Sequence, residues 1–202
     1  MSLTGHIRAR TEQSLAFRID GRMIARRVDV GQLVKPGELV AELDSQPQQD
    51  ALRGAQAQLS AAHASLHEAT NNLERQRVLV AQGWSTRVQF DAIQKTFLSA
   101  TADVDAAAAK LHSAEDRLGY TKLLAGSAGA VIATGAEAGE VVRAGQMIVT
   151  VAHDDGADAV FDVPATLLRQ VSPDAKISIA LTDIPQFTPS VRCGNWRRRP
   201  TR

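Results

Sequence analysis

The chain has 202 residues, with 23 Lys or Arg against 22 Asp or Glu and a formal net charge of +1. This balance excludes a strongly basic surface and argues against nucleic acid as a partner. Apolar residues make up 44% of the chain but aromatic residues only 4%, so any core is built mainly from Ala, Leu and Val. The single cysteine, Cys193, excludes an intramolecular disulfide and a multi-cysteine zinc site.

Targeting and membrane-spanning signals are not visible in the sequence. Residues 1–6 lack the apolar run of a signal peptide, and no stretch reaches the ~18 consecutive apolar residues that cross a bilayer. We therefore expect that the targeting segment of an exported protein lies outside this sequence.

The segment of residues 21–43 recurs as residues 129–151, at a constant offset of 108 positions. Identical residues stand at six aligned positions, namely Gly21/Gly129, Ile24/Ile132, Ala25/Ala133, Gly31/Gly139, Val34/Val142 and Gly37/Gly145. Each copy alternates short apolar runs with turn residues, which is typical of β-strands. The sequence therefore predicts two equivalent units of strand, turn and strand.

A tight turn precedes the last apolar run of each copy. Pro36 fixes φ at the first corner, and Gly37 tolerates a positive φ at the second corner, as a type II turn requires. Gly145 is the equivalent glycine of the second copy, and Gly31 and Gly139 stand at the preceding bend of each copy. We predict that these five residues are structural turn positions.

Apolar residues recur every seven positions between the two copies, in two series. The first series is Leu52, Leu59, Leu66, Leu73 and Val80, and the second is Phe90, Phe97, Val104, Leu111 and Leu118. Alanine or isoleucine follows three positions after most of them, which is the a/d seam of a coiled coil. Two seams of equal length predict an antiparallel helical hairpin over residues 45–119, with a paired part about 43 Å long.

Capping patterns suggest where each helix begins and ends. Ser45 and Thr86 each open a Ser/Thr-x-x-Gln capping box, so both are predicted N-caps. Gly83 suits the left-handed residue that ends a helix, and this places Trp84 at the tip of the hairpin. Trp84 is either a docking residue or a hydrophobic staple packed on the next helical turn.

Residues 154–191 read as a small β-domain that ends early. We predict a strand at 160–163, a short helix at 165–171 and a strand at 177–181. The tail of residues 192–202 lacks strand alternation and core residues, and its Arg197–Arg199 beside Trp196 suggest contact with anionic lipid as one alternative. The other is that the chain is a fragment, or is truncated by a frameshift.

Residues 28–44 and 138–151 resemble the two halves of a lipoyl/biotinyl module, which implies a flattened β-sandwich of two quasi-symmetric halves. In carriers of that family a tight hairpin joins the halves and bears the modified lysine, whereas here residues 45–119 replace that hairpin. Lys95, Lys110 and Lys122 lack the sequence context of a modified lysine. No biotin or lipoyl cofactor is therefore expected, and a carrier-like domain is the less favoured alternative.

A lipoyl-like module that is split by a long hairpin and followed by a β-domain resembles the periplasmic adaptors, or membrane fusion proteins, of tripartite efflux pumps. The implied fold is α+β: a split β-sandwich of residues 1–44 and 120–153, the hairpin of 45–119, and an incomplete β-barrel domain of 154–191. After Tyr120-Thr121 the chain reads Leu-Ala-Gly-Ser-Ala-Gly, where the family usually has a proline before the glycine.

The resemblance extends to the hairpin tip. Adaptors of resistance-nodulation-division (RND) transporters carry an Arg, a Leu four positions later and a Ser seven positions after that. Arg75, Leu79 and Thr86 match these positions, the last as a conservative departure. The resemblance implies that an outer-membrane channel is contacted by the tip residues Arg75, Leu79, Gly83, Trp84, Ser85 and Thr86.

The resemblance also implies a function and partners. The chain would be a non-enzymatic periplasmic adaptor, attached to the inner membrane when full-length, that links an inner-membrane transporter to an outer-membrane channel. Several copies, as a trimer or hexamer, would form a ring around the exported molecule. An adaptor of an ATP-driven exporter or of a type I secretion system is the alternative.

Catalytic and metal-binding motifs are not found in the sequence. It contains no phosphate-binding loop, no His-Glu-x-x-His and no Gly-x-Ser-x-Gly, so we do not expect an enzyme. His63 and His67 are spaced i, i+4 and are either a weak metal pair or two exposed histidines. With three methionines in the chain, a methionine-based copper site is not supported, and we expect no metal.

Overall fold

The computed structural model describes residues 5–161, 177–178 and 190–191. The chain divides into two units, one of Ala9–Ala157 and one of Met1–Arg8 with Asp158–Arg202. Apart from Ala9 and Ala157, the latter unit contains β1 (Gly5–Ala9), which pairs with β10 (Ala157–Phe161). It also contains β11 (Ile177–Ser178), which pairs antiparallel with β12 (Ser190–Val191). The helix predicted at 165–171, most of the predicted barrel portion and the basic tail lie outside the described residues.

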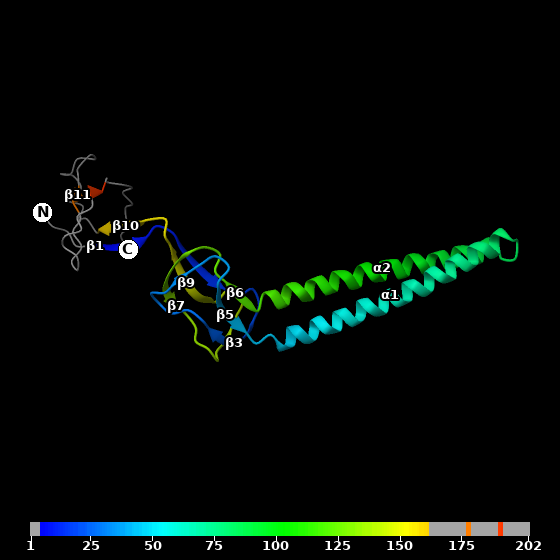
Figure 1. The fold of residues 1–202 in the computed structure, drawn as a ribbon, viewed down its shortest axis with the longest axis horizontal. Helices are drawn as coiled ribbons and strands as arrows, with labels where there is room; N and C mark the ends of the chain where they lie inside the picture. The colour runs from blue at the N-terminus through cyan, green and yellow to red at the C-terminus, as the bar shows by residue number, and fades with distance from the viewer. Residues whose placement is uncertain (1–4, 162–176, 179–189, 192–202) are drawn as a thin grey trace, which may run out of the picture. The chain divides into compact units, whose positions relative to one another are not determined.

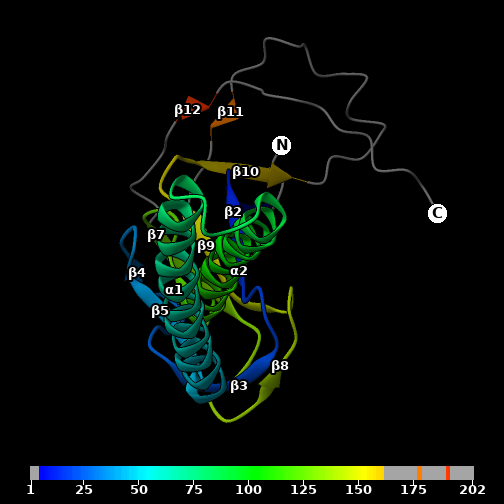
Figure 2. The ribbon, with the colours of Figure 1, turned by 90° about the vertical axis from the view of Figure 1, so that its right-hand side faces the viewer.

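Two four-stranded antiparallel sheets form the β-part of the unit Ala9–Ala157 (Figures 1 and 2). The first sheet has the order β2 (Glu12–Ala16), β9 (Met147–His153), β7 (Gly129–Thr134) and β4 (Leu33–Val34). The second has the order β6 (Lys122–Leu124), β5 (Leu39–Leu43), β3 (Gly21–Arg26) and β8 (Val141–Val142). The predicted split sandwich is confirmed.

The two sequence repeats exchange their short strands. β4 belongs to the first repeat but pairs with β7 of the second, whereas β8 belongs to the second repeat and pairs with β3 of the first. Each sheet therefore contains strands from both repeats. Neither repeat can complete its own sheet, because each edge strand comes from the other repeat.

Backbone hydrogen bonds repeat at the same offset of 108 positions. Amides donate to carbonyl oxygens from Gly31 to Val131 (2.8 Å), from Gly139 to Met23 (2.7 Å), from Gly37 to Ala125 (2.8 Å) and from Gly145 to Phe17 (2.9 Å). All four glycines have a positive φ, between 78° and 98°, a region that residues with a Cβ rarely adopt. Pro36 precedes Gly37 in a turn closed by a hydrogen bond from the Glu38 amide to the Lys35 carbonyl (3.1 Å).

The structural repeat begins earlier in the chain than the sequence repeat. On β2, Leu15 lies opposite Val149 of β9, and on β6, Leu123 lies opposite Ala41 of β5. These two pairs are also related by the offset of 108 positions. β2 and β6 are therefore equivalent strands, although the similarity found in the sequence begins only at Gly21.

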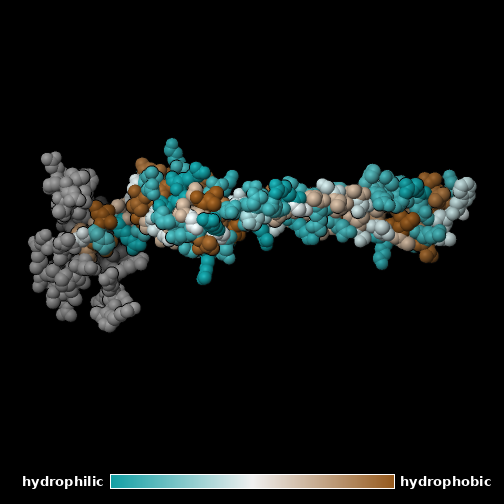
Figure 3. Space-filling model, turned by 90° about the horizontal axis from the view of Figure 1, so that it is seen from below, coloured by the Kyte–Doolittle hydropathy of each residue, from teal (hydrophilic) through white to brown (hydrophobic). Residues whose placement is uncertain are grey.

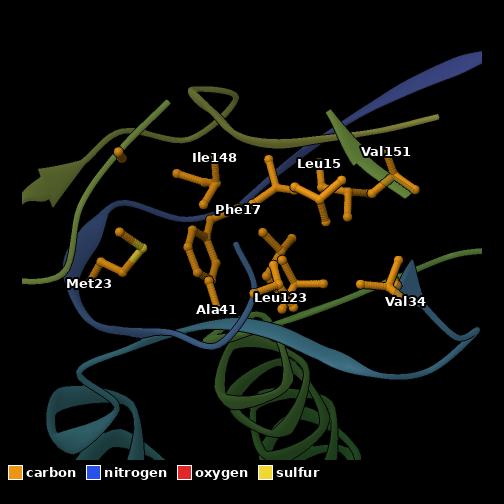
Figure 4. Packing of buried hydrophobic residues seen from close by; sticks show 14 of the residues in the cluster. Leu15, Phe17, Met23, Val34, Ala41, Leu123, Ile148 and Val151 are labelled. Atoms are coloured by element: carbon orange, nitrogen blue, oxygen red, sulfur yellow. The ribbon is translucent and has the colours of Figure 1, made fainter. Parts of the chain in front are cut away.

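The core lies between the two sheets (Figure 4). Its fully buried side chains come from both repeats, and include Met23, Val40, Leu43, Val131, Val142, Ile148, Val149 and Val151. Phe17 is the one aromatic residue of this cluster, which is otherwise aliphatic as the composition predicts. No helical residue belongs to the cluster, so the described sandwich buries its core without the hairpin.

The largely buried side chain of one arginine, Arg26, joins the two repeats outside the core. Arg26 on β3 donates from Nη2 to both carboxylate oxygens of Glu137 (3.0 Å each) and from Nη1 to Asp29 (2.8 Å). These hydrogen bonds, chiefly the one to Glu137, raise the pKa of the Arg26 guanidinium. Asp29 and Glu137 are equivalent positions of the two repeats. The single guanidinium of Arg26 therefore pairs with one carboxylate from each repeat.

The helical hairpin consists of α1 (Gln46–Ala81) and α2 (Arg87–Gly119), which lie side by side (Figures 1 and 2). Every leucine, valine and phenylalanine of the two predicted heptad series is half-buried. Four of the intervening alanines, Ala69, Ala100, Ala107 and Ala114, are buried. The predicted seam is thus confirmed. In the described part of the chain, no helix is both long and apolar enough to cross a membrane.

The two helix starts differ from one another. Thr86 forms the predicted capping box: its hydroxyl accepts from the Gln89 amide, and the Gln89 side chain accepts from the Thr86 amide. Ser45 is the N-cap position of α1 as predicted, but its predicted capping box is wrong, because Ser45 has a ψ of 0° and makes no side-chain cap. Instead the Gln46 amide donates to the Asp44 carboxylate (3.1 Å), and Pro47 has no amide hydrogen to donate.

The hairpin is inserted between β5 and β6. At its base, the Leu43 amide donates to the Thr121 carbonyl (2.8 Å), so the β5–β6 pairing continues to the point where the chain enters and leaves the helices. The Thr121 side chain is fully buried, and its hydroxyl donates to the Leu118 carbonyl (2.7 Å). This connection is the one that a tight hairpin makes in the carrier modules that the sequence resembles.

Candidate functional site: the hairpin tip

The tip begins where α1 ends, at Gly83. Gly83 has a φ of 76°, its amide donates to the Val80 carbonyl (3.0 Å), and the Trp84 amide donates to the Leu79 carbonyl (2.9 Å). These two bonds form a Schellman motif, which satisfies the last carbonyls of the helix. The chain therefore reverses within a fixed backbone turn.

A network of polar side chains ties the turn to both helices. The Gln76 side-chain amide on α1 donates to the Ser85 hydroxyl, and this hydroxyl donates to Gln89 Oε1 on α2 (3.0 Å). The same oxygen accepts from the Thr86 amide (3.3 Å) and the Thr86 hydroxyl (3.2 Å). Because each helix contributes one glutamine, the network holds the turn in one position between them.

Large apolar side chains remain exposed around this turn (Figure 3). The exposed fractions are 79% for Trp84, 77% for Val88, 55% for Val78 and 37% for Leu79. A Trp84 staple on the next helical turn would bury the indole, so this exposure favours the docking interpretation. Contiguous exposed apolar side chains mark candidate interaction surfaces, which makes the tip the candidate functional site.

Leu79 and Trp84 share a shallow groove of about 420 Å³ with residues of both helices. The groove is lined by Gln76, Leu79, Trp84, Ser85, Gln89, Ala92 and Ile93. The structure therefore brings three of the predicted site residues, Leu79, Trp84 and Ser85, together in one depression. Arg75, Gly83 and Thr86 do not line it. Arg75 is exposed and its guanidinium contacts the Asn72 side chain.

Four groove residues, Gln76, Gln89, Ala92 and Ile93, were not among the predicted site residues. A signal for Gln76 is present in the sequence, because a glutamine stands there where the heptad expects an apolar d residue. Gln89 was recognised only for its cap. Ala92 and Ile93 carry no separate signal, since their place in the groove depends on how the two helices are rotated about their axes.

The two histidines of α1 do not belong to a larger metal-binding group within the described residues. No group of three or more His, Cys, Asp or Glu side chains in that part of the chain is arranged to hold a metal ion. His67 contacts the Asn71 side chain (3.2 Å), and both His63 and His67 are exposed. The tip presents shape, apolar surface and charge, which suit binding of a partner.

Comparisons with known proteins agree with this architecture. Residues 51–121 match the family model described as the α-helical hairpin domain of RND membrane fusion proteins. The chain is 31% identical over 169 residues to the multidrug resistance protein MdtA of Escherichia coli O17:K52:H18. This alignment covers 83% of the chain and 41% of that protein. It is 30% identical over 166 residues to MdtA of Pectobacterium carotovorum, covering 81% of the chain and 40% of the relative.

A solved structure of the periplasmic adaptor protein EmrA shares the fold, with a TM-score of 0.63 and 16% identity over 93% of this chain and 85% of that one. The chain spans about two fifths of the length of the curated relatives that it matches. Three observations agree with a membrane fusion protein: the split sandwich, the inserted hairpin and the matched hairpin sequence. Residues 51–121 match the hairpin domain of RND membrane fusion proteins, and the chain as a whole is similar in sequence to the MdtA proteins and in fold to a periplasmic adaptor.

Proposed function

We propose that the protein is a non-enzymatic periplasmic adaptor subunit that links an inner-membrane efflux transporter to an outer-membrane channel for the export of small molecules. The observation that carries the proposal is the hairpin tip, where a fixed turn presents exposed apolar side chains at the end of two long paired helices. The relatives named as multidrug resistance proteins support export as the process.

In this proposal the hairpin acts as a rigid spacer. A helix rises ~1.5 Å per residue, so the 36 residues of α1 extend about 54 Å from the sandwich. A shaft of this length separates the tip, which binds the channel through Arg75, Leu79 and Trp84, from the transporter-facing part. Several copies assemble as a ring so that substrate passes inside it.

We also propose that the chain divides into the sandwich of residues 1–44 and 120–153, the hairpin of 45–119 and a barrel portion of 154–191. The full-length protein is attached to the inner membrane. The match to the RND-type hairpin model favours this transporter class over an ATP-driven exporter or a type I secretion system. A carrier role has no support, because the hairpin occupies the connection between β5 and β6.

The tip assignment is tested with Leu79→Asp and Arg75→Asp in the full chain. Both side chains are exposed and neither belongs to the core, so we expect the fold to persist and the affinity for the channel to fall at least ~10-fold. The measurement is binding of the purified chain to purified outer-membrane channels of its source organism in nanodiscs, by biolayer interferometry.

Leu98→Asp is the matched control. Leu98 is an exposed leucine on the shaft of α2, 59% exposed, and lies outside the tip groove. We expect Leu98→Asp to bind the channel like the unaltered chain, and all three variants to show the same far-UV circular dichroism. Unchanged channel binding by both Leu79→Asp and Arg75→Asp would remove the tip assignment.

A further inference from the structure

The hairpin tip combines exposed apolar side chains with three arginines, of which Arg75 and Arg87 form no ion pair within the described residues. We propose that it binds an acidic protein surface, in which carboxylates surround an apolar recess that receives Trp84 and Leu79. The inference rests on the proposed function and deepens it, because it states the chemistry of the channel surface that the tip meets.

The turn and its flanking helical ends are positively charged between two bordering carboxylates, Glu74 and Asp91. Residues 75–90 contain three arginines, Arg75, Arg77 and Arg87, and no Asp or Glu. Arg77 forms a long ion pair with Glu74 (3.9 Å), and Arg75 donates to the neutral Asn72 side chain. Within the described residues, Arg87 makes neither an ion pair nor a side-chain hydrogen bond. Two of the three cations are therefore available to an external anion.

Arg87 occupies a helix N-terminus, where the helix dipole disfavours a cation. It is the first residue of α2, directly after the Thr86 cap, and the first turn of this helix contains no acidic residue. The amide dipoles of a helix place partial positive charge at its N-terminus, so a carboxylate is stabilising there and a guanidinium is not. An arginine at this place adds to the positive potential that an incoming acidic surface meets.

The apolar part of the tip identifies a protein as the partner in preference to a lipid surface. The groove lined by Leu79, Trp84 and Ile93 is held by the hydrogen bonds of Gln76 and Gln89, so it is preformed and suits a partner of complementary shape. Basic clusters that bind anionic membranes contain about 4–8 Lys or Arg. The three arginines of the tip fall below that range.

Charge reversal at Arg87 tests the proposal with the full chain and the same purified outer-membrane channels. At low salt we expect Arg87→Glu to weaken channel binding at least ~10-fold, and Arg87→Lys to weaken it less than ~3-fold. The binding of the unaltered chain is expected to weaken as NaCl rises, with a smaller slope for Arg87→Glu. Misfolding does not explain such a loss, since a carboxylate at this position stabilises the helix N-terminus.

Lys110→Glu is the matched control, because Lys110 is an exposed cation on the shaft of α2. We expect it to bind the channel like the unaltered chain. Equal binding by Arg87→Glu and the unaltered chain, or no salt dependence, would overturn the acidic partner while leaving the adaptor function standing. No binding of any channel by the unaltered chain would overturn both.

Lipid vesicles test whether the tip binds an anionic membrane instead of an acidic protein. One kind contains phosphatidylcholine with phosphatidylglycerol, and the other contains phosphatidylcholine alone. We expect no binding of the unaltered chain to either kind of vesicle. Binding to the anionic vesicles that Arg87→Glu abolishes would assign the tip to a membrane and would overturn the protein partner.

Discussion

The two N-caps of the hairpin show how a single neighbouring residue decides whether a capping pattern is used. Thr86 has an extended backbone, with a ψ of 153°, and its hydroxyl reaches the Gln89 amide. Ser45 has a ψ of 0° and is followed at the second helical position by Pro47. Asp44 then supplies the acceptor for the Gln46 amide, one residue before the predicted cap.

We predict that removing the Thr86 hydroxyl lowers the free energy of unfolding of the hairpin more than removing the Ser45 hydroxyl does. Thr86→Ala deletes a cap that accepts a backbone amide, so it is expected to lower the free energy of unfolding of the hairpin by ~1 kcal/mol. Ser45→Ala deletes only a hydrogen bond with the exposed Gln49 side chain, so its effect is expected to stay within ~0.5 kcal/mol. Urea unfolding followed by helical circular dichroism measures both. Equal losses in the two variants would contradict the assignment of the caps.

The tip residues were only partly accessible to sequence reasoning. The break after Gly83 located the turn, and its place between two heptad series put Trp84 at the end of the hairpin. Which side chains share the groove was not predictable, because that depends on how α1 and α2 are rotated against each other. The two glutamines illustrate this limit. No sequence pattern links Gln76 or Gln89 to Ser85, and both contact the Ser85 hydroxyl only once the turn has folded.

At the scale of the helices, small residues in the seam control how closely the hairpin packs. The buried seam residues are alanines, whereas the leucines and phenylalanines beside them are half-buried. Alanine side chains let two helices approach each other closely, and the larger residues then cover the edges of the contact. The hairpin thus obtains a continuous contact with few fully buried large side chains.

A larger residue in this seam is expected to separate the helices. Ala107 is 3% exposed, so Ala107→Leu should lower the free energy of unfolding of the hairpin by ~1–3 kcal/mol through overpacking. Ala108 is exposed on the same helix, and Ala108→Leu is expected to change it by less than ~0.5 kcal/mol. Thermal unfolding followed by circular dichroism compares them. A destabilisation by Ala108→Leu as large as that by Ala107→Leu would show that the seam is misassigned.

The strands were less predictable than the helices. The heptad series extends over many turns, so its period stands out, and all its large members lie in the seam. β2 and β6 are equivalent strands of five and three residues, too short to show a period, and Phe17 in one half corresponds to Ala125 in the other. Their equivalence rests on backbone pairing to β9 and β5, which the side-chain pattern does not encode.

At the scale of the unit Ala9–Ala157, the hairpin is an insertion into a sandwich that is complete without it. The core cluster takes all its members from the two repeats and the strands that flank them. The hydrogen bond from the Leu43 amide to the Thr121 carbonyl brings the two ends of the insertion together within one strand pair. The sandwich thus holds the hairpin base, while the tip makes no contribution to the core.

This arrangement predicts that the hairpin can be removed. Replacement of residues 46–119 by a short Gly-Ser linker in the full chain is expected to leave a folded sandwich, with dispersed methyl NMR signals and cooperative unfolding, because only a two-strand connection has to be closed. The same variant should lose channel binding. Adding Val142→Asp is the control: Val142 is fully buried and lies on the strand that the second repeat contributes to the first, so a carboxylate there should unfold the sandwich. A linker variant that lacks dispersed signals even without Val142→Asp would mean that the hairpin helps to hold the two repeats together.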